Sequence, residues 1–151
     1  MSSESYPGTR DVAQSTPSAP FRWPVRIYYE DTDAGGVVYY ANYLNFFERA
    51  RTEWLRSLGF AQDTLRSRHG VIFVVRKVSI NYWSPARLDD RLTVLARVAH
   101  CGRVGLDFEQ EIRRDTDGRR CTSALVSVAC VRVGDWRPAR IPAELLERIG
   151  Q

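Results

Sequence analysis

The sequence predicts an α+β fold in which one antiparallel β-sheet wraps around a single long central helix. Three observations support this prediction. One helical stretch carries an apolar stripe rich in aromatic residues, strand patterns lie on both sides of it, and short turns join the strands that follow. Strands joined by short turns pair as antiparallel neighbours, and an aromatic helix face needs a sheet to cover it.

The central helix is expected from residue 42 to 58. Its apolar residues recur at the spacing of one helix face, at Tyr43, Phe46, Phe47, Ala50, Trp54 and Leu58. Asn42 is the expected N-cap, and Gly59 is the expected end signal. A shorter helix is expected around residues 62–68, closed by Gly70.

The remaining patterns predict strands. Residues 21–29 alternate between apolar and polar side chains, and Pro24 is typical of an edge strand. Arg76 and Lys77 indicate a bulge in a later strand, and residues 115–118 form a glycine-containing hairpin loop. The other expected elements are strands at 71–83, 92–98, 104–112 and 120–133 and a short helix at 142–149. The open edges of such a sheet commonly pair with a second subunit.

The chain of 151 residues is expected to form a single domain at residues 21–151. Residues 1–20 are rich in Ser, Pro and Thr and are expected to form a flexible tail. No apolar stretch approaches the roughly 20 residues that cross a bilayer, so no integral membrane association is expected. The three cysteines form no CxxC pair, which favours reduced thiols and a cytoplasmic location. The net charge of +4 is too weak to indicate nucleic-acid binding.

A chemically suggestive segment, DTDAGG, occupies residues 31–36, shortly before the helix. Gly35 and Gly36 allow the backbone to turn and to approach a ligand closely. The helix start offers unpaired N–H groups that can stabilise an oxyanion forming on a carbonyl. A carboxylate held beside them can attack that carbonyl or activate a water.

Three other interpretations of this segment remain open. The acidic residues can be ordinary turn and N-capping residues, or they can bind a divalent cation. The Asp-x-Asp pattern also occurs in haloacid-dehalogenase-like phosphotransferases. Those enzymes usually have Thr or Val at the position of Gly35, and they need a parallel α/β pattern that this sequence lacks.

Residues 29–43 read YEDTDAGGVVYYANY, and residues 48–53 read ERARTE. These stretches resemble the signature of the 4-hydroxybenzoyl-CoA thioesterase superfamily, and they are closest to its branch associated with the bacterial Tol–Pal system. The resemblance covers residues 22–145, including PARLDD at 85–90. It implies a hotdog fold, hydrolysis of acyl-CoA thioesters without a metal or redox cofactor, and assembly as homodimers or homotetramers with active sites at subunit interfaces.

By this resemblance, Asp33 matches the catalytic aspartate, which attacks the thioester directly or activates a water. Tyr40 matches the position whose backbone N–H polarises the thioester carbonyl. The Tol–Pal branch typically carries His there, and the hydroxybenzoyl-CoA type carries Tyr. Coenzyme A carries phosphates, which arginines bind well. The residues expected to bind substrate are Gly35, Gly36, Arg103, Arg137 and Arg140.

The sequence therefore predicts a cytoplasmic acyl-CoA thioesterase. One alternative is a non-catalytic hotdog protein that binds acyl-CoA or acts as a scaffold for a cell-envelope partner. Another is a dehydratase or isomerase acting on acyl thioesters, for which Glu48 on the helix would be the candidate carboxylate. Asp33 followed by a glycine turn favours the hydrolase, because a scaffold needs no carboxylate at that position.

Overall fold

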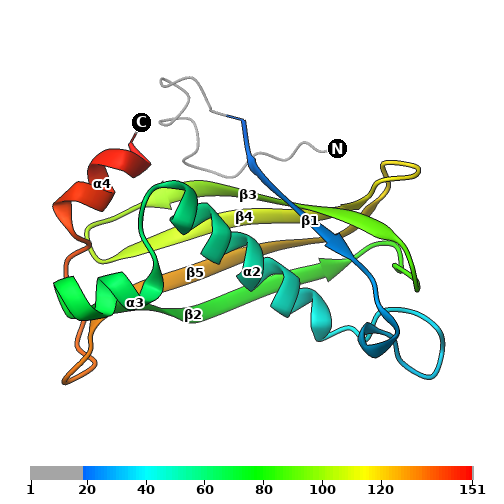
Figure 1. The fold of residues 1–151 in the computed structure, drawn as a ribbon, viewed down its shortest axis with the longest axis horizontal. Helices are drawn as coiled ribbons and strands as arrows, with labels where there is room; N and C mark the ends of the chain where they lie inside the picture. The colour runs from blue at the N-terminus through cyan, green and yellow to red at the C-terminus, as the bar shows by residue number, and fades with distance from the viewer. Residues whose placement is uncertain (1–18, 151) are drawn as a thin grey trace.

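A five-stranded antiparallel sheet carries one long helix, α2, across its face (Figure 1). This arrangement confirms the predicted α+β class and the sheet wrapped around a helix. The computed structural model describes residues 19–150, so the expected tail at residues 1–20 lies almost wholly outside the described residues. The elements are β1 (Phe21–Arg26), η1 (Tyr29–Asp31), α2 (Asn42–Ser57), α3 (Gln62–Thr64), η2 (Leu65–His69), β2 (Val71–Tyr82), β3 (Arg91–Cys101), β4 (Gly105–Arg114), β5 (Arg120–Arg132) and α4 (Ala143–Ile149).

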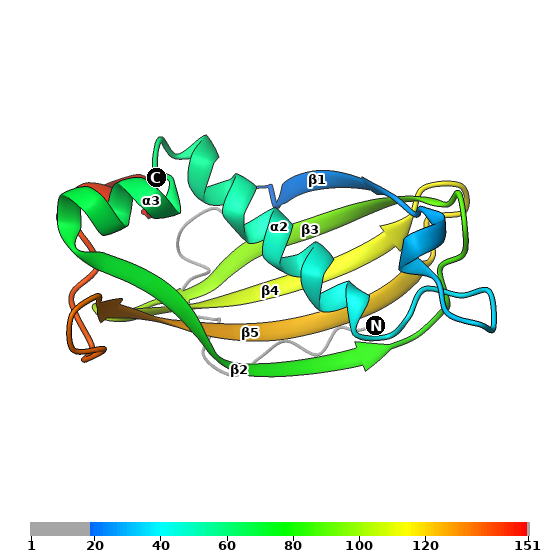
Figure 2. The ribbon, with the colours of Figure 1, turned by 60° about the horizontal axis from the view of Figure 1, so that its bottom comes forward.

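The strands lie in the order β1-β3-β4-β5-β2, which leaves β1 and β2 at the two edges (Figure 2). Antiparallel pairing of consecutive strands is confirmed for β3 with β4 and for β4 with β5. The expectation is wrong for β2, which pairs with β5 instead of β3. The reason is that residues 83–90 leave the sheet after β2 and pass beside the start of α2, where the Val38 N–H donates to the Ala86 carbonyl at 2.9 Å.

Two local expectations about the strands have different outcomes. The bulge is confirmed by a register shift between Val75 and Lys77. The first strand is shorter than expected, because the chain turns into a single 3₁₀ turn at residues 29–31. The Tyr28 N–H donates to the Asp31 carboxylate at 2.8 Å there, so a side chain takes the hydrogen bond that a strand partner would have made.

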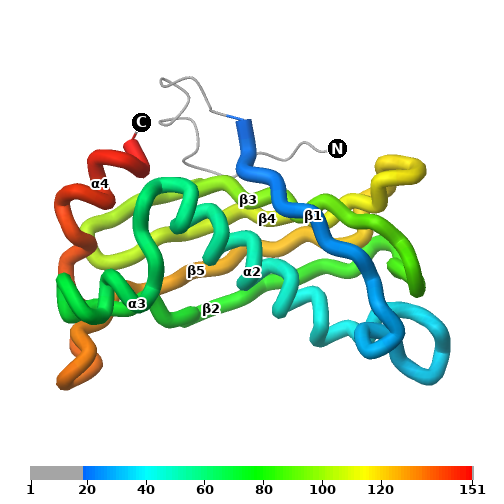
Figure 3. The backbone as a smooth tube through the Cα atoms, in the orientation of Figure 1, coloured from blue at the N-terminus to red at the C-terminus, as the bar shows by residue number. Residues whose placement is uncertain are grey.

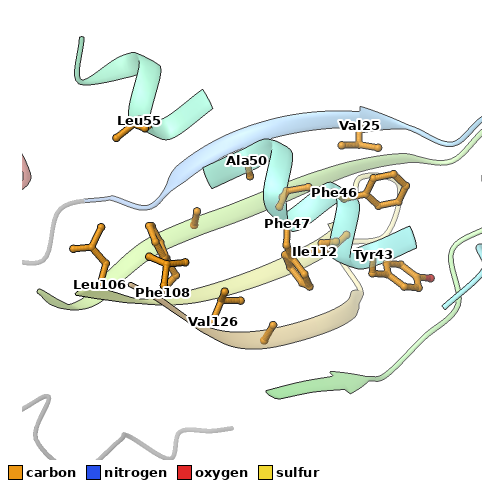
Figure 4. Close-up of a cluster of buried hydrophobic side chains, with 14 of the residues drawn as sticks. Val25, Tyr43, Phe46, Phe47, Ala50, Leu55, Leu106, Phe108, Ile112 and Val126 are labelled. Carbon is orange, nitrogen blue, oxygen red and sulfur yellow. The ribbon is translucent and has the colours of Figure 1, made fainter. Parts of the chain in front are cut away.

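The apolar face of α2 forms the centre of the core (Figure 4). Tyr43, Phe46, Phe47 and Ala50 are buried as the stripe predicts, and Leu55 is buried beside them. The sheet contributes its helix-facing side chains. Among those that Figure 4 labels are Val25, Leu106, Phe108, Ile112 and Val126.

The ends of α2 are set by different residues. Gly59 ends the helix with φ of +91°, as predicted. The predicted N-cap is wrong, because Ala41 occupies the cap and Asn42 is the first helical residue. The Asn42 side chain instead donates to the Asp31 carbonyl at 2.9 Å and ties the preceding loop to the helix. Among the described residues, no helix is long and apolar enough to cross a membrane.

The helix does not cover the whole sheet. It packs mainly against β1 and β3, and the strand β2 lies beyond it at the opposite edge (Figure 2). Val75 and Val78 of β2, which share the face that carries the helix, are 49% and 38% exposed. This uncovered apolar strip runs alongside α2.

Candidate active site

The loop between β1 and α2 folds back on itself as a small hairpin. Thr32 and Val38 form an isolated antiparallel bridge. The Asp31 carbonyl accepts the Tyr39 N–H at 3.0 Å as well as the Asn42 side chain. The base of the hairpin is therefore fixed to the first turn of α2, and its tip, residues 33–36, projects beyond.

The three acidic residues of this loop have different surroundings. One Asp31 oxygen accepts the Tyr28 N–H at 2.8 Å and shapes the 3₁₀ turn. One Asp33 oxygen accepts the Gly35 N–H, also at 2.8 Å. The other Asp33 oxygen has no partner among the described residues, and the side chain is exposed. Glu30 is exposed, and its side chain has no recorded hydrogen bond within residues 19–150. Asp31 also has one oxygen without a recorded donor in the described part of the chain but is half-buried, so Asp33 is the carboxylate that combines a fixed position with an exposed side chain.

The two glycines of the loop serve Asp33 in different ways. Gly36 has φ of +83°, a conformation that side chains other than glycine rarely adopt, and its N–H donates to the Asp33 carbonyl at 3.0 Å. Gly35 lies so close that a Cβ built on it would be 3.3 Å from the Asp33 oxygen that it binds. The structure therefore places both predicted glycines against Asp33.

Tyr40 lies immediately before α2, with its backbone N–H free of any recorded acceptor among residues 19–150. Its carbonyl accepts the Tyr82 hydroxyl at 3.1 Å. The Tyr82 phenol is protonated at neutral pH, and burial raises its pKa further above the ordinary value of 10.0. The free amide sits at the positive end of the α2 dipole, so it is suited to receive a developing negative charge.

The connection at residues 83–90 packs against the start of α2. The Ala86 N–H donates to the Tyr43 hydroxyl at 3.1 Å, and this contact is buried. Burial raises the pKa of Tyr43, and the hydrogen bond from Ala86 acts in the opposite direction. Tyr43, Tyr82 and Ala86 contact the start of α2 in this way, although the sequence pattern places them in the core, in a strand and in a connecting segment.

The three predicted arginines are not at this site in the single chain. Arg103 lies in the β3–β4 turn, and the Ile141 N–H donates to its carbonyl at 2.8 Å, which brings that turn beside the segment that contains Arg137 and Arg140. All three are exposed. This group lies at the opposite end of the sheet from the β1–α2 loop (Figure 3). The strand β5 spans the gap, and its 13 residues extend about 40 Å.

Glu48 is an alternative carboxylate that the structure separates from the loop. It lies on the second turn of α2 and accepts the Thr52 hydroxyl at 3.3 Å. It is exposed and close to Arg51, which binds Gln110 instead. Among the described residues, no cluster of three or more His, Cys, Asp or Glu side chains could hold a metal ion.

Comparison with known proteins identifies the family of this chain. Residues 27–149 match the model of the thioesterase-like superfamily. An acyl-CoA thioesterase, YbgC, of Haemophilus influenzae is 49% identical over 83% of this chain and 90% of its own length. The acyl-CoA thioester hydrolase YbgC of Escherichia coli is 44% identical over 87% of this chain and 96% of its own.

Solved structures show the same fold. A probable thioesterase from Bartonella henselae superimposes with a TM-score of 0.77 and 37% identity, over 82% of this chain and all of its own. A 1,4-dihydroxy-2-naphthoyl-CoA thioesterase from Synechocystis superimposes with a TM-score of 0.81, over 87% of this chain and 96% of its own. The latter is 23% identical and therefore supports the fold alone. From the family match and the YbgC relatives, this chain belongs to the thioesterase-like superfamily, with the hotdog fold.

Proposed function

We propose that this protein hydrolyses acyl-CoA thioesters, with Asp33 as the catalytic carboxylate and the Tyr40 N–H as a donor to the thioester carbonyl. The observation that carries the proposal is the Asp33 carboxylate, which the Gly35 N–H fixes at one oxygen while the other stays available. The relatives named as acyl-CoA thioesterases support the choice of substrate class.

The residues of the loop supply a complete route for hydrolysis. The thioester carbonyl oxygen accepts the Tyr40 N–H, which stabilises the charge that develops on it. Asp33 either removes a proton from an attacking water or attacks the carbonyl carbon itself, forming an anhydride that water then cleaves. In both routes the C–S bond breaks, the thiolate of coenzyme A takes up a proton, and the acyl group leaves as a carboxylate.

Asp33→Asn tests the assignment, because it keeps the shape of the side chain and removes its basicity. Losing a positioned base or nucleophile typically costs about 10²- to 10⁴-fold in turnover. The matched control is Asp31→Asn, two positions earlier, which keeps an oxygen for the Tyr28 N–H. Thiol release from short, long and aromatic acyl-CoAs is the measurement.

Two results of this experiment would count against the proposal. Near-wild-type turnover by folded Asp33→Asn would remove Asp33 from the chemistry. A wild-type protein that binds acyl-CoA but releases no thiol from any of these substrates would favour the non-catalytic alternative.

The active unit is proposed to be a homodimer or a homotetramer assembled through β2. This strand is at the sheet edge, and its apolar side chains Val75 and Val78 are uncovered, as expected for a surface that meets a second copy. Antiparallel pairing of two β2 strands about a two-fold axis would bring the partner's arginine-bearing end to the loop that carries Asp33. Arg103, Arg137 and Arg140 would then be available to bind coenzyme A phosphates across the interface.

Light scattering tests this assembly and separates two from four copies of the 17.3 kDa chain. A lone 17.3 kDa species at micromolar concentration would contradict it.

Charge reversal at Arg103, Arg137 or Arg140 should raise KM for acyl-CoA and leave the assembly intact. Unchanged KM in all three variants would remove these arginines from the substrate site.

We also propose a cytoplasmic location and a link to the Tol–Pal system. The support is the resemblance of residues 29–43 to the Tol–Pal-associated branch. Tyr40 replaces the His typical of that branch, which removes imidazole chemistry but preserves the backbone donor. Co-purification of Tol–Pal components with the intact protein tests the link, and their absence from stringent pull-downs would contradict it.

A further inference from the structure

A partly open pocket lies between the C-terminal half of α2 and the strand β2. Its volume is about 100 Å³. The polar side chains that line it are Glu48, Arg51 and Thr52 of α2 and Gln62 of α3. Its apolar walls are formed by Leu55, Phe73, Val75, Leu106, Phe108 and Val128. The pocket therefore suits a ligand with an apolar shaft and one polar end.

Arg51 is held at this pocket by a buried amide. Its guanidinium donates to the Gln110 side-chain oxygen at 2.9 Å, and the Gln110 side-chain nitrogen donates to the Phe47 carbonyl at 3.1 Å. Gln110 is only 3% exposed. Because its oxygen and its nitrogen are both hydrogen-bonded, the Gln110 amide links β4 to α2 and orients the arginine.

Among residues 19–150 the Arg51 guanidinium forms no ion pair, although the Glu48 carboxylate lies near enough to act on its charge. No carboxylate lies within 4.0 Å of the guanidinium, and its other N–H groups have no recorded acceptor. Glu48, the acid in the same pocket, accepts a hydrogen bond from Thr52 instead. Burial lowers the pKa of Arg51, and the nearby Glu48 carboxylate acts in the opposite direction. Arginine remains charged at neutral pH. A partly desolvated cation with free donors favours an incoming oxygen.

The pocket is in line with the proposed reaction centre. Tyr82, at one end of β2, binds the carbonyl of Tyr40, and Phe73, near the other end, lines the pocket. Along α2, the first helical residue, Asn42, and Arg51 are nine residues apart, or about 14 Å of helix. An acyl chain whose thioester lies at the Tyr40 amide and which runs between α2 and β2 reaches Arg51 with its distal end.

We propose that this pocket receives the distal end of the acyl group and that Arg51 determines specificity, selecting chains that end in an oxygen acceptor over methyl-ended chains of equal length. The inference rests on the proposed function and names the class of acyl group that the enzyme prefers. A terminal carboxylate should be favoured more than a terminal hydroxyl, because both partners are then charged.

The test compares matched substrates. For each even chain length from hexanoyl to dodecanoyl, kcat/KM is measured with the methyl-ended, ω-hydroxy and ω-carboxy acyl-CoA. A hydrogen bond to a charged group corresponds to a preference of about ten- to hundredfold for the oxygen-ended chain at the length that fits. Arg51→Met keeps the apolar stem and should reduce that ratio to near one.

Arg56→Met is the control, because Arg56 lies on the same helix and pairs with Glu53 at the surface. It should leave the substrate ratio unchanged. If Arg51→Met does not fold, Arg51→Lys is used, and it should lower the ratio because lysine lacks the planar fork of donors. A purely structural role for Arg51 would change all substrates equally and leave the ratio as it was.

The proposal is overturned if wild type shows no preference at any length, or if the preference survives in both Arg51 variants. Binding of non-hydrolysable S-alkyl and S-(ω-carboxyalkyl) thioethers of coenzyme A separates this failure from failure of the proposed function. A protein that releases no thiol but binds the carboxylated thioether more tightly through Arg51 would retain the pocket assignment. Equal dissociation constants for the two thioethers would refute it.

Discussion

Replacing Gly35 by Ala should lower turnover while leaving stability intact. Unlike Gly36, Gly35 does not have a positive φ, so Ala can adopt its backbone conformation. The added Cβ would lie 3.3 Å from the Asp33 oxygen, and the carboxylate must move by a few tenths of an ångström to accept it. The perturbation therefore acts on the position of the proposed catalytic group.

The size of the effect follows from that displacement. A 1 Å misplacement of reacting groups can cost about 10²-fold in rate, so a shift of about 0.3 to 0.5 Å predicts a three- to tenfold loss in kcat/KM. Stability should stay level or rise by about 0.4 to 1 kcal/mol, because Ala restricts the unfolded chain. Gly36→Ala is the matched comparison. No atom lies within 4 Å of its added Cβ, but its φ of +83° should cost about 1 to 2 kcal/mol.

The assay is thiol release from an acyl-CoA, run beside thermal unfolding of the same samples. We expect Gly35→Ala to lose activity at an unchanged melting temperature and Gly36→Ala to melt several degrees lower. Wild-type kcat/KM in Gly35→Ala would refute the idea that this contact positions Asp33. A melting temperature that falls as far as in Gly36→Ala would show instead that the loop had been destabilised.

Three further predictions concern other parts of the molecule. Tyr40→Phe should keep turnover within about tenfold of wild type in the thiol-release assay, because the backbone donor is retained; a loss as large as that of Asp33→Asn would show that the phenol takes part. Hydrogen bonds from Arg114 and from the backbone hold the pKa of Asp117 at about 2, below its ordinary value of 3.8. This stabilises the folded protein above the ordinary value, so wild type should lose more thermal stability than Asp117→Asn as pH falls from about 4 to 2, and equal losses would contradict the pairing. Phe47→Ala should destabilise by about 3 to 5 kcal/mol in urea unfolding, because Phe47 is fully buried; a change below 1 kcal/mol would contradict its place in the core.

The sequence predicts the elements well where local periodicity decides them. The stripe from Tyr43 to Ala50, the end of α2 at Gly59 and the bulge before Lys77 all depend on residues close together in the chain. The pairing of β2 with β5 is determined instead by the path of residues 83–90 past the helix start. No local pattern reports that path, so the expected strand neighbours are wrong at this edge.

The candidate site shows the same division. Asp33, Gly35 and Gly36 lie within four positions, and turn chemistry predicts that they act together. Arg103 lies far from this loop because of the order and direction of the strands in the sheet. The positions of the strands along the sequence do not reveal that arrangement. The role of Gln110 cannot be predicted from the sequence for a different reason. Its position matches the helix-facing side of a strand, where an apolar side chain is expected, and only the contacts with Arg51 and Phe47 explain it.

The strand order also determines when the chain can fold during synthesis. Residues 71–82 form the edge strand β2, but their partner β5 ends only at Arg132. A nascent chain that has emerged through β4 has therefore completed α2 and three paired strands, with β2 still unpaired and its apolar face exposed. Contacts between such distant segments form slowly, and unpaired strand edges favour aggregation. Folding competence should consequently appear abruptly as β5 leaves the ribosome, and protection of the nascent chain matters most in the interval before it.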